Sequence, residues 1–183
     1  MLESAINFAT MKHEGQKRKY INLPYIVHPL TVMEIVRCVP DHTEEMLCAA
    51  VLHDTVEDTD TKLEEIEKIF GSTVYQYVYF LSDISKPEDG NRKIRKLIDR
   101  CHVAEGPKEV HTIKLADLID NSSSILLYDP NFAVVYIREK ESLLDMLTKG
   151  DSSLIDVANE IVKNYHLQKL MTKKKEKFWI RKN

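Results

Sequence analysis

Hydrophobic residues recur at helical spacing along nearly the whole chain. Near the start, Leu2, Ile6 and Ala9 lie three to four residues apart, which places them on one face of a helix. The segment 132–137 is strand-like in composition, but it follows a helix-start signal and the residues after it continue with helical spacing. Because no convincing strand pattern appears, we expect one all-α domain, a helical bundle of about eight or nine helices.

Capping residues and helix breakers indicate where these helices begin and end. Thr43 and Asp129 are typical N-cap residues, and residues 61–64 form the capping box T-x-x-E. Gly71 and Gly150 are expected to end the helices that precede them. After the first helix, the signals predict further helices over about 28–39, 43–56, 61–71, from 72 onward, 92–102, 107–127, 130–147 and 152–170.

Charge is distributed unevenly along the 183 residues. The 26 Lys and Arg residues against 29 Asp and Glu residues give a net charge of −3, which makes no overall case for binding nucleic acid or membranes. Residues 169–183 alone carry +6, so residues 1–168 carry −9. We therefore divide the chain into a domain over 1–168 and a basic C-terminal tail over 169–183. Such a tail is typical of a solvated helix end, with an RNA or acidic protein partner as the alternative.

Several classes of protein are excluded by composition. The five glycines lie too far apart to form G-x-G-x-x-G or a P-loop, so side chains or a metal would have to hold any phosphate. The three cysteines form no C-x-x-C and fit a reducing compartment, so we expect a cytoplasmic protein. No apolar run approaches the ~18 residues of a membrane span.

The segment Ala-Val-Leu-His-Asp-Thr-Val-Glu-Asp-Thr, residues 50–59, concentrates groups that can do chemistry. His53 and Asp54 are adjacent on the predicted helix, so both can reach one cation beside it. Glu57 and Asp58 follow these two residues by one helical turn and lie on the same side. Taken alone, the segment fits a metal site and a helix end with solvated acids equally well.

Two further segments add candidate ligands. His28 precedes a proline at a predicted helix start, where a lone histidine is more often a packing or capping residue. Lys114, Asp117 and Asn121 share one face of the predicted helix 107–127, and such a stripe is usually a solvent face.

Together, His28, His53, Asp54 and Asp117 make a set of two imidazoles and two carboxylates. Mixed nitrogen and oxygen ligands suit Mn²⁺, Fe²⁺ or Zn²⁺. The order of these residues resembles the H…HD…D pattern of the HD phosphohydrolase superfamily. Residues 52–59, L-H-D-T-V-E-D-T, resemble more specifically the hydrolase domain of the RelA/SpoT enzymes and the small alarmone hydrolases.

Other ordered matches extend this resemblance over roughly residues 1–150. They are Phe8-Ala9 with His13 and the basic loop 16–19, P-Y-I-V-H-P at 24–29, I-F-G at 69–71, and K-L-A-D at 114–117 with Asn121. The resemblance implies an HD-type helical domain. It also implies an enzyme that uses Mn²⁺ to remove the 3′-pyrophosphate of (p)ppGpp, giving GDP or GTP and pyrophosphate.

The resemblance also implies roles for individual residues. His28, His53, Asp54 and Asp117 become the metal ligands, and Glu57 and Asp58 become the catalytic pair. The remaining residues become substrate contacts: Arg18, Lys19 and Lys114 would neutralise phosphate, and Asn121 would hydrogen-bond the ribose or a phosphate.

Two departures from the family pattern fall in regions that contact substrate. Leu118 stands where relatives often have a basic residue, and the stretch 136–140 differs in register from an arginine–tyrosine pair of the animal-type hydrolases. Arg138 and Lys140 are the candidate replacements. These departures make hydrolysis of NADPH 2′-phosphate or a nucleoside triphosphate an alternative. The basic tail motivates another alternative, a nucleotide-binding or partner-binding module with little turnover. We expect a small nucleotide ligand rather than nucleic acid, and self-association into a homo-oligomer is compatible with the sequence.

Overall fold

The computed structural model describes residues 1–180, with side chains described for residues 1–172. No strand occurs in this part of the chain, apart from an isolated bridge between Lys17 and Pro24, so the all-α prediction is confirmed. The helices are α1 (Leu2–Lys12), α2 (Val27–Arg37), α3 (Glu44–Leu52), α4 (Thr55–Asp58), α5 (Leu63–Phe70), α6 (Ser72–Leu81), α7 (Arg92–Glu105), α8 (Lys108–Tyr128), α9 (Pro130–Leu144) and α10 (Ser152–Ile180), with a 3₁₀ turn, η1 (Pro87–Asp89).

Helix α3 forms the centre of the hydrophobic core. Residues 46–52 are apolar without interruption, and all of them are buried. A helix that is apolar on every side needs neighbours all round, and α3 packs against α1, α2, α6 and α8. His53 follows directly at the C-terminal end of α3, so the core holds this imidazole in place.

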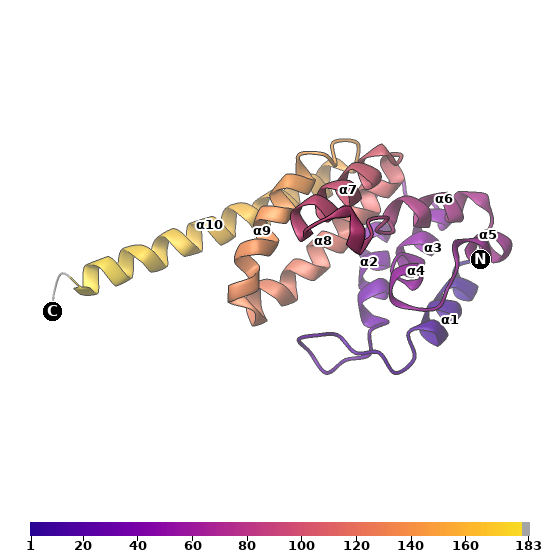
Figure 1. Cartoon of the computed structure of the whole chain (residues 1–183), viewed down its shortest axis with the longest axis horizontal. Helices are drawn as coiled ribbons and strands as arrows, with labels where there is room; N and C mark the ends of the chain where they lie inside the picture. Colours follow the sequence, from indigo (N-terminus) through magenta and orange to yellow (C-terminus); the bar gives the residue numbers. More distant parts are fainter. Residues whose placement is uncertain (181–183) are drawn as a thin grey trace.

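The C-terminal half of the molecule is built on the long helix α8. It packs against α2 and α3 on one side and against α9 and α10 on the other. Figure 1 shows α10 leaving the body and extending away from α2, α3 and α8. In the described part of the chain, no helix combines the length and apolarity that crossing a bilayer requires.

The predicted caps at Thr43 and Asp129 are both formed. The Thr43 Oγ1 accepts a hydrogen bond from the backbone N–H of Met46 at 3.2 Å, and the Asp129 Oδ1 accepts from that of Phe132 at 3.0 Å. The capping box predicted at Thr61 is wrong. Its hydroxyl pairs instead with the Thr59 hydroxyl at 2.8 Å, and α5 begins later, at Leu63.

Three helix boundaries also differ from the prediction. The segment 43–56 is not one helix, because a turn at residues 53–54 separates α3 from α4. Helix α9 ends at Leu144, so Gly150 does not terminate it, and α10 continues past residue 170 to Ile180. The basic tail therefore begins as helix, while the side chains after residue 172 and the whole of residues 181–183 lie outside the described part.

Candidate metal centre and active site

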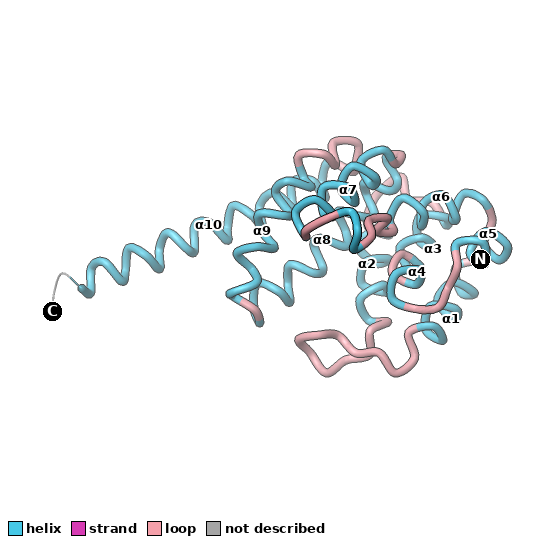
Figure 2. Tube along the Cα trace, viewed as in Figure 1, coloured by secondary structure: helices cyan, strands magenta, loops and turns pink. Residues whose placement is uncertain are grey.

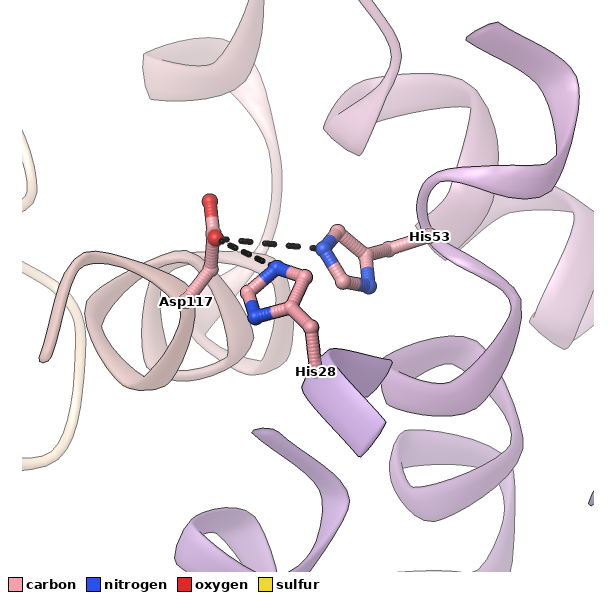
Figure 3. Close-up of side chains that lie close together, drawn as sticks. All are labelled: His28, His53 and Asp117. Carbon is pink, nitrogen blue, oxygen red and sulfur yellow. Dashed lines mark ion pairs between the residues drawn. The ribbon is translucent and has the colours of Figure 1, made fainter. Parts of the chain in front are cut away.

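Three helices bring buried ligand groups to one point. His28 lies in the first turn of α2, His53 follows α3, and Asp117 lies in the middle of α8. One ligand atom from each lies within 4.8 Å of those of the other two. Figure 3 shows both imidazoles pointing toward the carboxylate, with the Asp117 Oδ1 3.3 Å from the His28 Nε2 and 3.9 Å from the His53 Nε2.

Asp54 completes the predicted set of four. Its Oδ2 lies 3.1 Å from the His53 Nε2 and 3.5 Å from the His28 Nε2. The same oxygen accepts a hydrogen bond of 2.6 Å from the Tyr25 hydroxyl, which fixes the carboxylate's orientation. The turn between α3 and α4 thus places Asp54 on the same side as His53.

The hydrogen bonds of the two histidines leave one nitrogen of each for a cation. The His53 Nδ1 lies 2.8 Å from the Ala50 carbonyl oxygen, and the His28 Nδ1 lies 2.6 Å from the Asp120 Oδ2. A nitrogen facing such an acceptor carries the proton, so Nε2 can act as the ligand. The His53 Nε2 is buried without a hydrogen-bond partner among the described residues. This donor set fits a divalent cation.

The two acidic candidate ligands stay ionised inside the protein. Burial alone would raise the pKa of Asp54 and Asp117. His53 for Asp54, and chiefly Lys114 for Asp117, outweigh burial and hold each pKa well below its usual range. The Lys114 Nζ lies 2.9 Å from the Asp117 Oδ2. Buried carboxylates of this kind require compensating positive charge.

Without a cation, a histidine proton supplies part of that compensation. Burial lowers the pKa of His28, but hydrogen bonds to Asp117 and Asp120 outweigh it, and the pKa is raised to about 9. Because a ligating imidazole must be neutral, binding a metal here has to release this proton.

Glu57 and Asp58 lie on α4, one turn beyond the ligands, and both reach the surface. The Glu57 Oε1 accepts a hydrogen bond of 2.7 Å from the Asp83 N–H, and the Asp58 carbonyl accepts one of 2.7 Å from the Gln16 side chain. Desolvation by neighbouring atoms, opposed by Lys114, raises the pKa of Glu57 to about 7. Desolvation likewise raises the pKa of Asp58. A carboxyl group that titrates near neutrality suits a general base.

A cavity of about 210 Å³ lies beside the metal centre. Its walls come from the loop between α1 and α2 and from α8 and α9: Arg18, Lys19, Tyr20, Ile21, Tyr25, Asn121, Ser124, Ile125 and Phe132. The Asn121 Nδ2 donates a hydrogen bond of 2.6 Å to the Asp117 Oδ1, which connects this wall to the metal centre. Three predicted substrate contacts, Arg18, Lys19 and Asn121, therefore share one cavity.

The other predicted contacts lie elsewhere. Lys114 pairs with Asp117 and does not line this cavity. Arg138 is exposed on α9 and is not among the lining residues in the described part of the chain. Lys140 is only 1% exposed, and its ammonium donates a hydrogen bond of 2.7 Å to the Ser122 hydroxyl. Neither Arg138 nor Lys140 lines this cavity, so a substrate contact by either residue stays a prediction.

Sequence reasoning missed two features of the site. Asp120 accepts from His28, and Phe132 supplies an aromatic wall of the cavity. Asp120 could have been found, because it follows Asp117 by three residues and so shares its helix face. Phe132 comes from α9 and is brought near the loop 18–21 only by the tertiary fold.

Comparison with known proteins identifies the family of this chain. The family model described as HD domain matches residues 5–122. Among relatives, guanosine-3′,5′-bis(diphosphate) 3′-pyrophosphohydrolases from Aquifex aeolicus and Danio rerio are 39% and 38% identical over 131 and 122 residues. These matches cover 69% and 66% of this chain but only 18% and 64% of those two proteins. The Drosophila melanogaster enzyme is 34% identical, with 68% of this chain and 69% of that protein covered.

Solved structures agree as well. A metazoan ortholog of SpoT that hydrolyses ppGpp matches with a TM-score of 0.78 and 28% identity, over 89% of this chain and 94% of that one. A Listeria monocytogenes protein, 24% identical with a TM-score of 0.62, shares the fold. The chain therefore belongs to the HD-domain family of hydrolases and is homologous to the guanosine-3′,5′-bis(diphosphate) 3′-pyrophosphohydrolases.

Proposed function

We propose that this protein hydrolyses the 3′-pyrophosphate of (p)ppGpp, giving GDP or GTP and pyrophosphate. The observation that carries the proposal is the convergence of His28, His53, Asp54 and Asp117 one turn from Glu57. The relatives named for this reaction support the choice of substrate.

Four residues would hold the metal in this proposal: His28, His53, Asp54 and Asp117. We propose Mn²⁺, with Fe²⁺ or Zn²⁺ as alternatives, because two imidazoles and two carboxylates suit these ions. A bound cation would supply Lewis acidity toward a phosphoryl oxygen and lower the pKa of water in the site.

The side chains beside the metal would manage protons and charge. Pyrophosphate leaves in one piece, so the bond between the ribose 3′ oxygen and its phosphorus breaks, and a water oxygen takes its place on phosphorus. The 3′ oxygen keeps the electron pair of that bond and takes up a proton to become the 3′-hydroxyl of the product. Glu57 would take the proton from that water, with Asp58 as the second member of the proposed pair. Lys114 and Arg18 would offset phosphate charge, Arg18 from the wall of the 210 Å³ cavity.

A second candidate function keeps this chemistry and changes the nucleotide. Leu118 and the stretch 136–140 depart from the family pattern, and neither Arg138 nor Lys140 lines the cavity. Those departures motivate hydrolysis of NADPH 2′-phosphate or a nucleoside triphosphate as the alternative. A binding module with little turnover is disfavoured by the complete ligand set. We also propose a cytoplasmic location, which the free thiols of Cys38, Cys48 and Cys101 favour.

A screen of nucleotides separates these candidates. Purified protein loaded with Mn²⁺ is incubated with ppGpp, NADPH and nucleoside triphosphates, and released phosphate and pyrophosphate are measured separately. Our proposal predicts pyrophosphate from ppGpp and little product from the others. Phosphate release from NADPH without turnover of ppGpp would favour the second candidate.

A further inference from the structure

Asp120 holds together two parts of the site that lie far apart in sequence. A single oxygen, Oδ2, lies 2.6 Å from the His28 Nδ1 and accepts a hydrogen bond of 2.8 Å from the Arg18 Nη2. All three side chains are largely enclosed, with exposed fractions of 14% for Asp120, 1% for His28 and 10% for Arg18. Asp120 therefore contacts both a candidate metal ligand and a candidate phosphate-binding residue.

A second connection runs in parallel through the next residue of α8. The Arg18 Nη1 donates a hydrogen bond of 3.1 Å to the Asn121 Oδ1, and the Asn121 Nδ2 donates one of 2.6 Å to the Asp117 Oδ1. Two neighbouring residues thus join one guanidinium to two different candidate ligands.

Arg18 needs such support because its backbone is irregular. Residue 18 lies between α1 and α2, and Figure 2 shows this segment as a long loop. A flexible arginine loses considerable side-chain freedom when it is held in one orientation. The contacts with Asp120 and Asn121 fix that orientation before substrate arrives, and the cavity beside them lies within reach of the guanidinium.

We propose that Asp120 is a positioning residue that couples the metal centre to the substrate cavity. Toward His28, it holds the proton on Nδ1 and so presents Nε2 to the cation. Toward Arg18, it orients the guanidinium at the cavity wall. The Arg18 half rests on the proposed function, since it concerns a phosphorylated nucleotide, whereas the His28 half concerns metal binding alone.

The His28 half is tested by titrating Mn²⁺ into metal-free protein. Removing the partner of a metal-bound histidine typically weakens metal binding about 10–100-fold, and we expect a loss in this range for Asp120→Ala. Asp120→Asn keeps the side-chain shape and one acceptor oxygen, so its loss should be smaller. Asp156→Ala, which removes an exposed aspartate of α10, is the matched control and should bind like the wild type. Wild-type affinity in Asp120→Ala would overturn the proposal.

The Arg18 half is tested by a double-mutant cycle on KM for ppGpp. Asp120→Ala and Arg18→Ala should each raise KM about 10-fold, the value expected from losing a charge-assisted hydrogen bond. Only Asp120→Ala should weaken Mn²⁺ binding. If Asp120 acts on substrate through Arg18, KM of the double variant should rise by less than the product of the two single effects. A rise equal to that product would overturn the coupling.

Failure of the proposed function can be distinguished from failure of the role proposed for Asp120. A wild-type protein that binds Mn²⁺ but leaves ppGpp intact would contradict the proposed substrate, while the metal titration would still decide the His28 half. Thermal unfolding shows whether each variant is folded. If Asp120→Ala is not folded, the Mn²⁺ affinity is measured on Asp120→Asn, whose side chain has the same shape as that of the wild type.

Discussion

Each histidine of the candidate metal centre presents one nitrogen because the other is already engaged. The backbone carbonyl of Ala50 faces the Nδ1 of His53, and the Asp120 carboxylate faces that of His28. The carboxylate of Asp54 then lies near both free nitrogens. The affinity for a metal ion should therefore depend on the Nε2 atom of each histidine and on the carboxylate of Asp54.

Replacing Asp54 tests that dependence. Asp54→Ala removes one carboxylate from the ligand set, so we expect it to lose bound Mn²⁺ and turnover together. Asp60→Ala is the control, because that nearby carboxylate is exposed and pairs with Lys12. Metal content after dialysis, measured by elemental analysis, is the test. Full metal content in Asp54→Ala would contradict the assignment.

Replacing Glu57 tests the proton acceptor instead of the metal. A carboxyl group accepts a proton only when it is ionised, so activity should fall as the pH drops through the pKa of Glu57. Since desolvation raises this pKa toward about 7, from an ordinary 4.5, the acid limb of kcat should have its midpoint above 4.5. Glu57→Gln should abolish turnover while largely keeping the metal. Full activity of Glu57→Gln across the pH range would assign the base elsewhere.

For single residues, the sequence predicted which side chains belong to the candidate site better than it predicted the contacts that those side chains make. His28, His53, Asp54 and Asp117 were predicted as four candidate ligands from ordered motifs that resemble a known family, and the fold brings these four side chains together. The sequence could not place Lys140, because nothing in a helical pattern tells whether a lysine faces a cavity or the interior. Its burial beside Ser122 follows from how α9 packs on α8.

Among the helices, the break after α3 has the largest consequence for the site. The sequence predicted one helix over 43–56, since no proline or glycine interrupts it. In the structure, the Thr55 hydroxyl donates a hydrogen bond of 2.7 Å to the Leu52 carbonyl, and the backbone turns at residues 53–54. Local side-chain bonds of this kind compete with helix continuation and are hard to recognise from periodicity.

The start of the same helix offers a test of its stability. Thr43→Ala removes the hydroxyl that caps α3, so the free energy of unfolding should fall by about 1 kcal/mol. Thr43→Ser keeps the hydroxyl and should stay close to the wild type. Urea unfolding followed by circular dichroism measures both variants. Equal stability of the alanine and wild-type proteins would show that the cap contributes nothing.

Over the whole molecule, the site and the C-terminal helix are separate features. The candidate ligands come from α2, the end of α3, α8 and the connection to α4, whereas α10 contacts α8 and α9 and then leaves the body (Figure 1). The charge division at residue 169 was visible in the sequence, but the direction of the tail was not, because it depends on the packing at the start of α10. The boundary between domain and tail remains a prediction, as does self-association.

Deleting residues 172–183 tests this separation. Because the end of α10 lies away from the metal centre, kcat and KM for ppGpp should stay within about twofold of the wild type, a range that corresponds to less than 0.5 kcal/mol. Steady-state kinetics on the truncated chain provides the measurement. A large loss of activity in a folded truncated protein would mean that the tail completes the site.

The most direct test of the account as a whole is the identity of the products formed from ppGpp. Purified protein is stripped of metal, reloaded with Mn²⁺, and incubated with ppGpp, and the products are separated by anion exchange beside a relative of known activity. We predict equimolar GDP and pyrophosphate, with no product from the stripped protein. Intact ppGpp in the reloaded sample, while the relative converts it, would contradict the proposed function.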